Sequence, residues 1–221
     1  MLSFLLRVQS WLLVVAFLSG VVHSQVDFFE ITGRGSVEDV RAAIRAGANV
    51  NAHGGILGWT PLMVAAAFNE NPKVVLVLLD AGAELEARNE NDWTPLIVAA
   101  AMNASAEVVR ALLDADAELE ARAEFSITPL MAAAAMNASA EVVRALLDAD
   151  ANVEARDELG RTPLMHAAWH SSPEVLQMLL DAGTDAKAAD QAGHRAIDYA
   201  REDEHLQGTD VFWQLHDASF D

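Results

Sequence analysis

The sequence contains no cysteine among its 221 residues. This absence excludes disulfides, thiolate nucleophiles, cysteine-ligated zinc and lipidation at a cysteine. Basic residues are scarce as well, since 14 Lys and Arg stand against 33 Asp and Glu and leave a net charge of −19. A nucleic-acid-binding surface needs a basic footprint, so we expect no nucleic acid among the partners. The same acidic surface favours a basic partner without identifying it.

Motifs that carry catalysis are also missing. Gly33-Arg34-Gly35 lacks the Gly-Lys-Ser/Thr ending of a phosphate-binding loop and is interpreted as a turn between two helices. Carboxylate pairs such as Glu86 and Asp92 recur along the chain. Catalytic pairs need dissimilar environments, so this repetition indicates a solvated surface. We therefore expect no enzyme activity, no catalytic residues and no cofactor.

Residues 1–24 differ in composition from everything that follows them. Arg7 is their only charged residue, an apolar run follows from Trp11, and Val22 and Ser24 are small enough for the −3 and −1 positions of a cleavage site. The pattern predicts a secretory signal peptide at 1–24 that is cleaved off. The alternative is a retained anchor, but the apolar core spans 12 residues, from 11 to 22, and a bilayer span needs roughly 20. We expect a periplasmic or secreted protein without stable membrane insertion.

The rest of the chain is organised by an internal repeat. Thr-Pro-Leu begins at Thr60, Thr94, Thr128 and Thr162, always 34 residues apart, and a degenerate copy begins at Arg195. The stretches 99–122 and 133–156 differ at only two positions, which indicates a duplication. Self-similarity at such a period is typical of stacked solenoid repeats.

One repeat has a simple physical interpretation. Thr94 is suited to cap a helix, and Pro95 fits its first turn, where the missing N–H costs nothing. A second helix is predicted from Ala106, and Gly82 of the preceding unit is suited to the left-handed residue after that unit's second helix. An extended finger then leads to the next unit. Two short helices cannot bury their apolar faces alone, so stacking of equivalent units must supply the core.

The patterns Thr-Pro-Leu-x-x-Ala-Ala, Glu-Val-Val-x-x-Leu-Leu and Ala-Gly-Ala-x-Val-x-Ala resemble the ankyrin repeat over roughly residues 28–217. The resemblance implies an all-α solenoid of helix-turn-helix units with β-hairpin-like fingers, about six units with atypical ends. The expected divisions are an N-terminal capping repeat at 25–59, repeats at 60–93, 94–127, 128–161 and 162–194, and a C-terminal capping repeat with tail at 195–221. The Met-rich first helices are similar to those of bacterial ankyrin proteins.

The sequence departs from the ankyrin pattern in two ways. Met or Ile stands where the family favours His after Thr-Pro-Leu, at Met63, Ile97, Met131 and Met165. The Thr–His hydrogen bond that is usual in the family is therefore not expected. Asp116 and Asp150 replace the glycine after the second helix, at a cost of about 1 kcal/mol each, because Asp tolerates the left-handed region less well than glycine does.

Ankyrin proteins usually bind partners on their concave face, which finger tips and the exposed ends of the first helices form. The matching positions of this sequence are apolar or aromatic for the most part, and we name them the concave stripe: Ile56, Leu57, Trp59, Phe68, Trp93, Met102, Phe125, Ile127, Met136, Leu159, Arg161, Trp169 and His170. Exposed apolar patches mark interaction sites, so the stripe is the predicted partner-binding surface, with Trp59, Trp93, Phe125 and Trp169 as anchors. The alternative is that these side chains pack between adjacent fingers.

Arginines recur just after each finger, at Arg88, Arg122 and Arg156. They are expected either to form a ladder with Glu86, Glu120 and Glu154 or to belong to a diffuse surface ion-pair network.

The function predicted from these features is non-catalytic binding of a protein partner outside the cytoplasm. An accessory, assembly, inhibitor or immunity role would fit, and a monomer is expected. The alternative function is binding of a metal or small ligand through His166 and His170, which are four residues apart on a helix, with His194 as a further candidate. That pair lacks both the Glu of a metalloprotease motif and an evident third ligand, so we predict no metal site.

Overall fold

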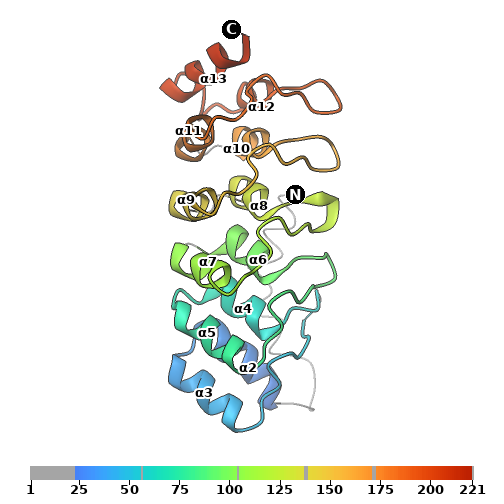
Figure 1. The fold of residues 1–221 in the computed structure, drawn as a ribbon, viewed down its shortest axis with the longest axis vertical. Helices are drawn as coiled ribbons and strands as arrows, with labels where there is room; N and C mark the ends of the chain where they lie inside the picture. The colour runs from blue at the N-terminus through green and yellow to red at the C-terminus, as the bar shows by residue number, and fades with distance from the viewer. Residues whose placement is uncertain (1–22, 56, 104, 137–138, 171–172, 221) are drawn as a thin grey trace.

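The computed structural model describes residues 23–55, 57–103, 105–136, 139–170 and 173–220. Residues 1–22 of the predicted signal peptide and Ile56 of the concave stripe lie outside this range, as does the side chain of His170. The described chain is an elongated stack of helix pairs (Figure 1). No helix in the described ranges is long and apolar enough to cross a bilayer.

Each unit contributes one helix to an inner row and one to an outer row. The inner row consists of α2 (His23–Arg34), α4 (Pro61–Phe68), α6 (Pro95–Met102), α8 (Pro129–Ala135), α10 (Pro163–His170) and α12 (Ala196–Ala200). The outer row consists of α3 (Val37–Arg45), α5 (Pro72–Asp80), α7 (Ala106–Leu113), α9 (Ala140–Asp148), α11 (Pro173–Asp181) and α13 (Asp210–Phe220). Consecutive helices of a row contact each other, and the fingers project from the side opposite the outer row (Figure 1). This is the all-α solenoid expected from the repeat.

The helix boundaries follow the local sequence signals. The hydroxyls of Thr60, Thr94 and Thr128 each accept a hydrogen bond from the backbone N–H three residues later, and a proline occupies the first turn each time. After the second helices, Gly82 adopts a φ of 88°, and Asp116 and Asp150 adopt φ values of 65° and 63°. The predicted caps and left-handed residues are therefore confirmed, including the two aspartates that replace glycine.

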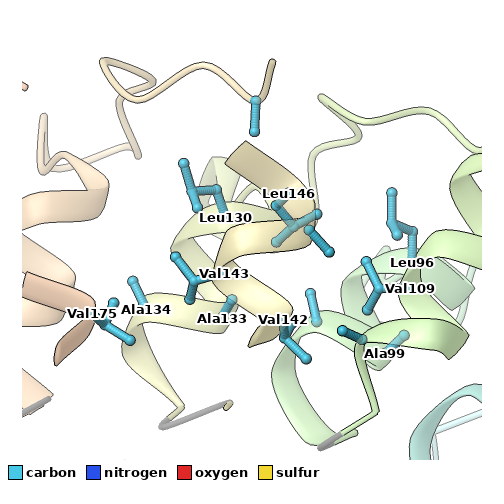
Figure 2. Packing of buried hydrophobic residues seen from close by; sticks show 14 of the residues in the cluster. Leu96, Ala99, Val109, Leu130, Ala133, Ala134, Val142, Val143, Leu146 and Val175 are labelled. Atoms are coloured by element: carbon cyan, nitrogen blue, oxygen red, sulfur yellow. The ribbon is translucent and has the colours of Figure 1, made fainter. Parts of the chain in front are cut away.

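A continuous core runs between the two rows of helices. It extends from Phe28 near one end of the stack to Leu215 near the other, and small alanines such as Ala99 and Ala133 allow the inner helices to approach closely (Figure 2). Val109 and Val142 fill the space between inner and outer helices and are fully buried. Each unit thus covers the apolar face of its neighbour, as solenoid stacking requires.

Backbone hydrogen bonds also join the finger tips of successive units. The N–H of Glu90 donates to the carbonyl of Leu57 at 3.0 Å, and that of Glu158 donates to the carbonyl of Phe125 at 3.0 Å. Glu124 and Gln191 repeat the contact with the carbonyls of Asn91 and Leu159. These bonds fix the separation between fingers, so the side chains on them form a preorganised surface.

The recurring arginines make a different ladder from the predicted one. The guanidinium of Arg122 donates to the carbonyl of Ser126 at 3.3 Å and to that of Arg156 in the next unit at 3.0 Å. Arg88 and Arg156 make the same pair of contacts one unit away on either side. Glu86, Glu120 and Glu154 instead accept backbone N–H groups of the following unit at 2.7–2.9 Å. The predicted ladder of these arginines with these glutamates is therefore wrong, because both partners bond to backbone groups. Arg88 instead lies 4.0 Å from the exposed carboxylate of Glu118, as the alternative of a surface ion-pair network predicts.

Candidate protein-interaction surface

The concave stripe is formed by three columns of residues that repeat from unit to unit. One column lies at the finger tips, with Leu57, Phe125 and Leu159. A second lies where each finger returns to its helix, with Trp59, Trp93, Ile127 and Arg161. The third lies at the ends of the inner helices, with Phe68, Met102, Met136 and Trp169. The tertiary structure thus brings together side chains that are 34 residues apart in the chain.

The middle of the stripe is packed into the array. Trp93, Met102, Ile127 and Met136 are half-buried and pack against a small cluster that includes Ile97 and Ala132. Trp59 is half-buried as well and packs on a second cluster around Met63 and Val98. Packing between fingers and helices, which was the alternative interpretation of the stripe, therefore applies to these five residues.

Of the stripe residues whose side chains the structure describes, four large apolar ones remain exposed. Phe68 is 38% exposed, Trp169 45%, Leu159 54% and Phe125 58%. Large apolar side chains left in water along one face are the feature that marks interaction surfaces. The exposed part of the stripe runs from α4 to α10 and follows the fingers and inner helices.

Trp59, from the packed part of the stripe, contacts Phe68, from its exposed part. Their rings stack with centroids 6.0 Å apart and an interplanar angle of 16°. The indole Nε1 of Trp59 is buried and has no hydrogen-bond partner. An unpaired buried N–H is unfavourable, so packing of the ring outweighs that cost and fixes Trp59 as a support beneath Phe68.

Phe125 has an unusual backbone. It lies in a short 3-10 turn, Glu124–Ser126, where Phe125 and Ser126 both have a φ of 61°. This left-handed conformation costs a residue with a bulky side chain about 1–2 kcal/mol. Burial does not offset the cost, because the ring is mostly in water. Strain at an exposed aromatic is the kind of outlier that accumulates at binding sites.

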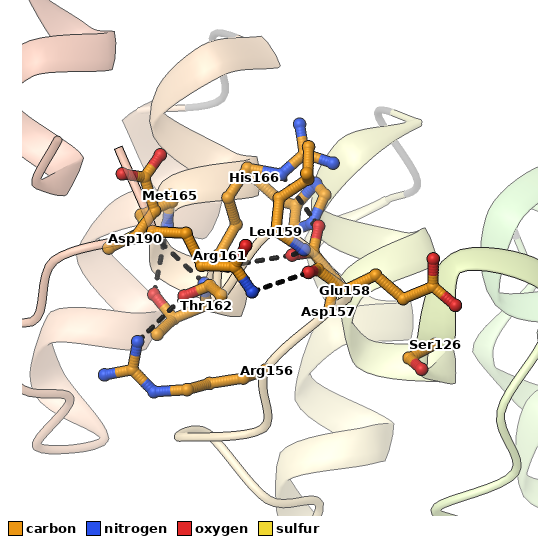
Figure 3. Close-up of polar contacts among 12 residues, drawn as sticks. Ser126, Arg156, Asp157, Glu158, Leu159, Arg161, Thr162, Met165, His166 and Asp190 are labelled. Atoms are coloured by element: carbon orange, nitrogen blue, oxygen red, sulfur yellow. Dashed lines mark hydrogen bonds and ion pairs between the residues drawn. The ribbon is translucent and has the colours of Figure 1, made fainter. Parts of the chain in front are cut away.

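A buried polar cluster supports the far end of the stripe (Figure 3). The carboxylate of Asp157 accepts hydrogen bonds from the Arg161 Nε at 2.7 Å and from the backbone N–H groups of Leu159 and Arg161. His166 Nε2 lies 3.1 Å from the same carboxylate, and both side chains are buried. Burial by itself would raise the pKa of Asp157. The hydrogen bonds from His166 and Arg161 and the charge of Arg161 outweigh burial and lower the pKa to about 2.

This cluster positions Trp169. The guanidinium of Arg161 lies 5.4 Å from the centroid of the Trp169 ring, and the ring of Tyr199 stacks on Trp169 at 5.4 Å. The Tyr199 hydroxyl donates to Asp190 at 2.5 Å, and burial together with that carboxylate raises the pKa of Tyr199 to about 12. Trp169 is therefore held by neighbours from the units before and after its own.

The surroundings of the stripe are acidic. Glu90, Glu124 and Glu158 occupy equivalent positions at the finger tips, 34 residues apart, and all three are exposed. Asp92 is exposed at the tip beside Glu90. Carboxylates therefore border the exposed apolar side chains of the stripe.

Two of the histidines predicted as alternative ligands, His166 and His194, contact different carboxylates. His166 is directed into the repeat toward Asp157, whereas the His194 side chain is 58% exposed and lies 3.6 Å from Asp190. The side chain of His170 lies outside the described residues. Within the described ranges, no group of three or more His, Cys, Asp or Glu side chains is arranged to hold a metal ion.

Sequence reasoning missed the supporting residues Asp157 and Tyr199. Tyr199 is the only tyrosine of the chain, and Asp157 lies in the finger just before the Thr162 repeat start, but no motif links them to Trp169. Their proximity depends on stacking of units rather than on local spacing.

Comparison with known families agrees with this architecture. The family described as ankyrin repeats (3 copies) matches residues 29–123 and 100–190. No curated protein matches the chain.

Proposed function

The chain belongs to the ankyrin-repeat family, whose members are generally protein–protein interaction modules, and on that premise we propose that it binds a protein partner through the exposed part of the concave stripe. In this proposal the protein is a non-catalytic monomer that acts outside the cytoplasm in an accessory, assembly or inhibitor role. Its partner carries an apolar patch bordered by basic residues.

The single observation that supports this proposal most strongly is the exposed ring of Phe125 on a left-handed backbone. Its ring is 58% exposed on a backbone with a φ of 61°, so neither burial nor backbone conformation accounts for an aromatic residue there. A partner that covers the ring supplies the missing burial. Rigid aromatics are also the typical anchors of interfaces, because they lose little conformational entropy on binding.

Preorganisation supports the same surface. Hydrogen bonds between finger tips hold Phe125 and Leu159 at a fixed separation, since the N–H of Glu158 donates to Phe125 and that of Gln191 to Leu159. A surface that is already ordered avoids the entropic cost of ordering on association. The finger carboxylates would increase the association rate with a basic partner at low salt.

The experiment is capture of partners from the envelope fraction of the source cells with immobilised protein. The Phe125→Ala, Leu159→Ala double variant removes two exposed anchors, and its affinity is expected to fall on the order of a thousandfold if each anchor contributes about 2 kcal/mol. The matched control is Leu76→Ala, Trp213→Ala, which truncates side chains that are 44% and 54% exposed on outer helices. Capture that survives in the stripe variant, or fails equally in the control, would contradict the proposal.

The proposed export from the cytoplasm is tested separately from partner binding. N-terminal sequencing of protein recovered outside the cytoplasm is expected to begin at Gln25, after removal of residues 1–24. Recovery of the intact chain from the cytoplasm would remove the extracytoplasmic part of the proposal and leave the binding surface unaffected.

A further inference from the structure

A shallow hollow lies at the end of the concave stripe, between α10 and the loop that follows α12. It is open to solvent, has a volume of about 360 Å³ and is lined by Trp169, Tyr199, Glu202, Asp203, Glu204 and His205. That volume is at the low end of the ~300–1,000 Å³ typical of ligand pockets, so the hollow suits a single side chain.

The hollow combines an aromatic wall with uncompensated negative charge. Glu202 and Glu204 are exposed, and neither carboxylate makes a hydrogen bond or ion pair to another described residue. Nearby cations are already paired, since Arg201 contacts Asp198 at 3.2 Å and Arg161 contacts Asp157 at 2.7 Å. Two carboxylates therefore remain available beside the stacked rings of Trp169 and Tyr199.

The loop that carries these carboxylates is ordered by its own contacts. Leu206 is fully buried in the core, and the Gln207 amide donates to the carbonyl of Arg201 at 2.7 Å. The N–H of His205 donates to the Asp203 carboxylate at 2.8 Å. Because the opposite wall is fixed by the Tyr199–Asp190 hydrogen bond, the hollow exists before any ligand arrives.

We propose that this hollow is a subsite for an arginine side chain of the protein partner. The aliphatic stem and planar guanidinium would lie against Trp169 and Tyr199, and the guanidinium N–H groups would donate to Glu202 and Glu204. A guanidinium suits this combination better than an ammonium, since it stacks on aromatic rings and donates in a planar fork. Arg161, which already lies over Trp169, shows the same pairing within the chain.

This inference rests on the proposed function, because Trp169 belongs to both surfaces. The two are tested separately, since the subsite is probed with a small molecule and without the partner. The probe is N-acetyl-arginine-amide, titrated into the purified ¹⁵N-labelled protein. The readouts are the indole N–H resonance of Trp169, assigned with the Trp169→Phe variant, and the amide resonances of residues 202–205.

We expect saturable shifts confined to these resonances. The Glu202→Gln, Glu204→Gln variant is expected to bind the probe at least about tenfold more weakly, because both carboxylate acceptors lose their charge. The matched control Glu141→Gln, Glu174→Gln removes two exposed carboxylates from α9 and α11 and should bind as the parent does. The Phe125→Ala, Leu159→Ala variant should also bind the probe normally, even where it no longer captures the partner.

Three results would overturn the subsite itself, and a fourth would overturn its assignment to arginine. One is the absence of a saturable shift, and another is unchanged affinity in the Glu202→Gln, Glu204→Gln variant. The third is equal binding of N-acetyl-norleucine-amide, which would indicate a purely apolar site. Equal binding of N-acetyl-lysine-amide with a free ε-amine would overturn the choice of guanidinium over ammonium.

Discussion

The side chain of Asn103 donates a hydrogen bond to the backbone carbonyl of Ala66 in the preceding unit, at 2.8 Å. The same amide donates to the carbonyl of Asn69 at 3.1 Å, and the Asn103 side-chain oxygen accepts the N–H of Ser105 at 2.8 Å. Asn69 makes the equivalent contacts with Thr32 and Gly35 one unit earlier. These asparagines satisfy carbonyls at the ends of the inner helices and join each unit to the one before it.

Replacing Asn103 with alanine is therefore expected to lower the free energy of unfolding by about 2 kcal/mol, because buried carbonyls lose their donor. Urea denaturation followed by circular dichroism measures the loss. The control is Ser105→Ala, which removes a hydroxyl that donates to the exposed carboxylate of Glu107 at 3.0 Å. A similar loss in both variants would show that the contact between units is not the cause.

The lowered pKa of Asp157 predicts a specific dependence of the protein's stability on pH. Its pKa in the folded protein is about 2, below the ordinary value of 3.8. A lowered folded-state pKa gives stability that is complete above the unfolded pKa and is lost as the pH falls through the folded pKa. The Asp157→Asn variant should thus be less stable than the parent by about 2 kcal/mol at pH 7, and the difference should shrink between about pH 4 and pH 2.

Urea denaturation of both proteins across that pH range checks this. Asp114→Asn removes an exposed carboxylate and is expected to change the free energy of unfolding at pH 7 by no more than about 0.5 kcal/mol. A difference between the parent and Asp157→Asn that stays constant down to pH 2 would exclude this carboxylate as the titrating group.

Substitutions of Glu120 test whether the contacts between units are hydrogen bonds to the backbone or ion pairs with arginines. Its carboxylate accepts the N–H of Asn152 at 2.8 Å, and a glutamine oxygen accepts the same bond without a charge. Glu120→Gln should therefore retain most of the stability, and Glu120→Ala should lose about 1 kcal/mol. Thermal denaturation of the two variants decides between them. Equal losses in both would favour an ion pair with the neighbouring arginines.

Local signals in the sequence predicted much of the fold correctly. The Thr-Pro starts and the residues after the second helices depend only on neighbours within a few positions, so Thr94, Asp116 and Asp150 behave as predicted. Of the two arrangements predicted for the recurring arginines, the ladder with Glu86, Glu120 and Glu154 is wrong. Arg122 lies two residues from Glu120, but its hydrogen bonds go to Ser126 and to Arg156 of the following unit.

The candidate site was predicted in outline only. Periodicity identified the positions that face the fingers and inner helices, but periodicity carries no information on how far a neighbouring unit covers each side chain. Trp93 and Phe125 are both finger aromatics, yet Trp93 packs beside Met102 and Phe125 remains in water. The difference arises because Trp93 lies where its finger returns to the inner helix, whereas Phe125 lies at a finger tip, in the left-handed turn Glu124–Ser126.

The sequence by itself determined the repeat, its period, its helix caps and the acidic character of the surface, because each depends on composition or on residues close together in the chain. The tertiary structure decided which stripe residues stay exposed and how Asp157, Trp169 and Tyr199 meet. It also placed Glu202 and Glu204 beside the stacked rings. Those outcomes depend on contacts between successive units, and they are fixed only when the helices pack and bury the continuous core between them.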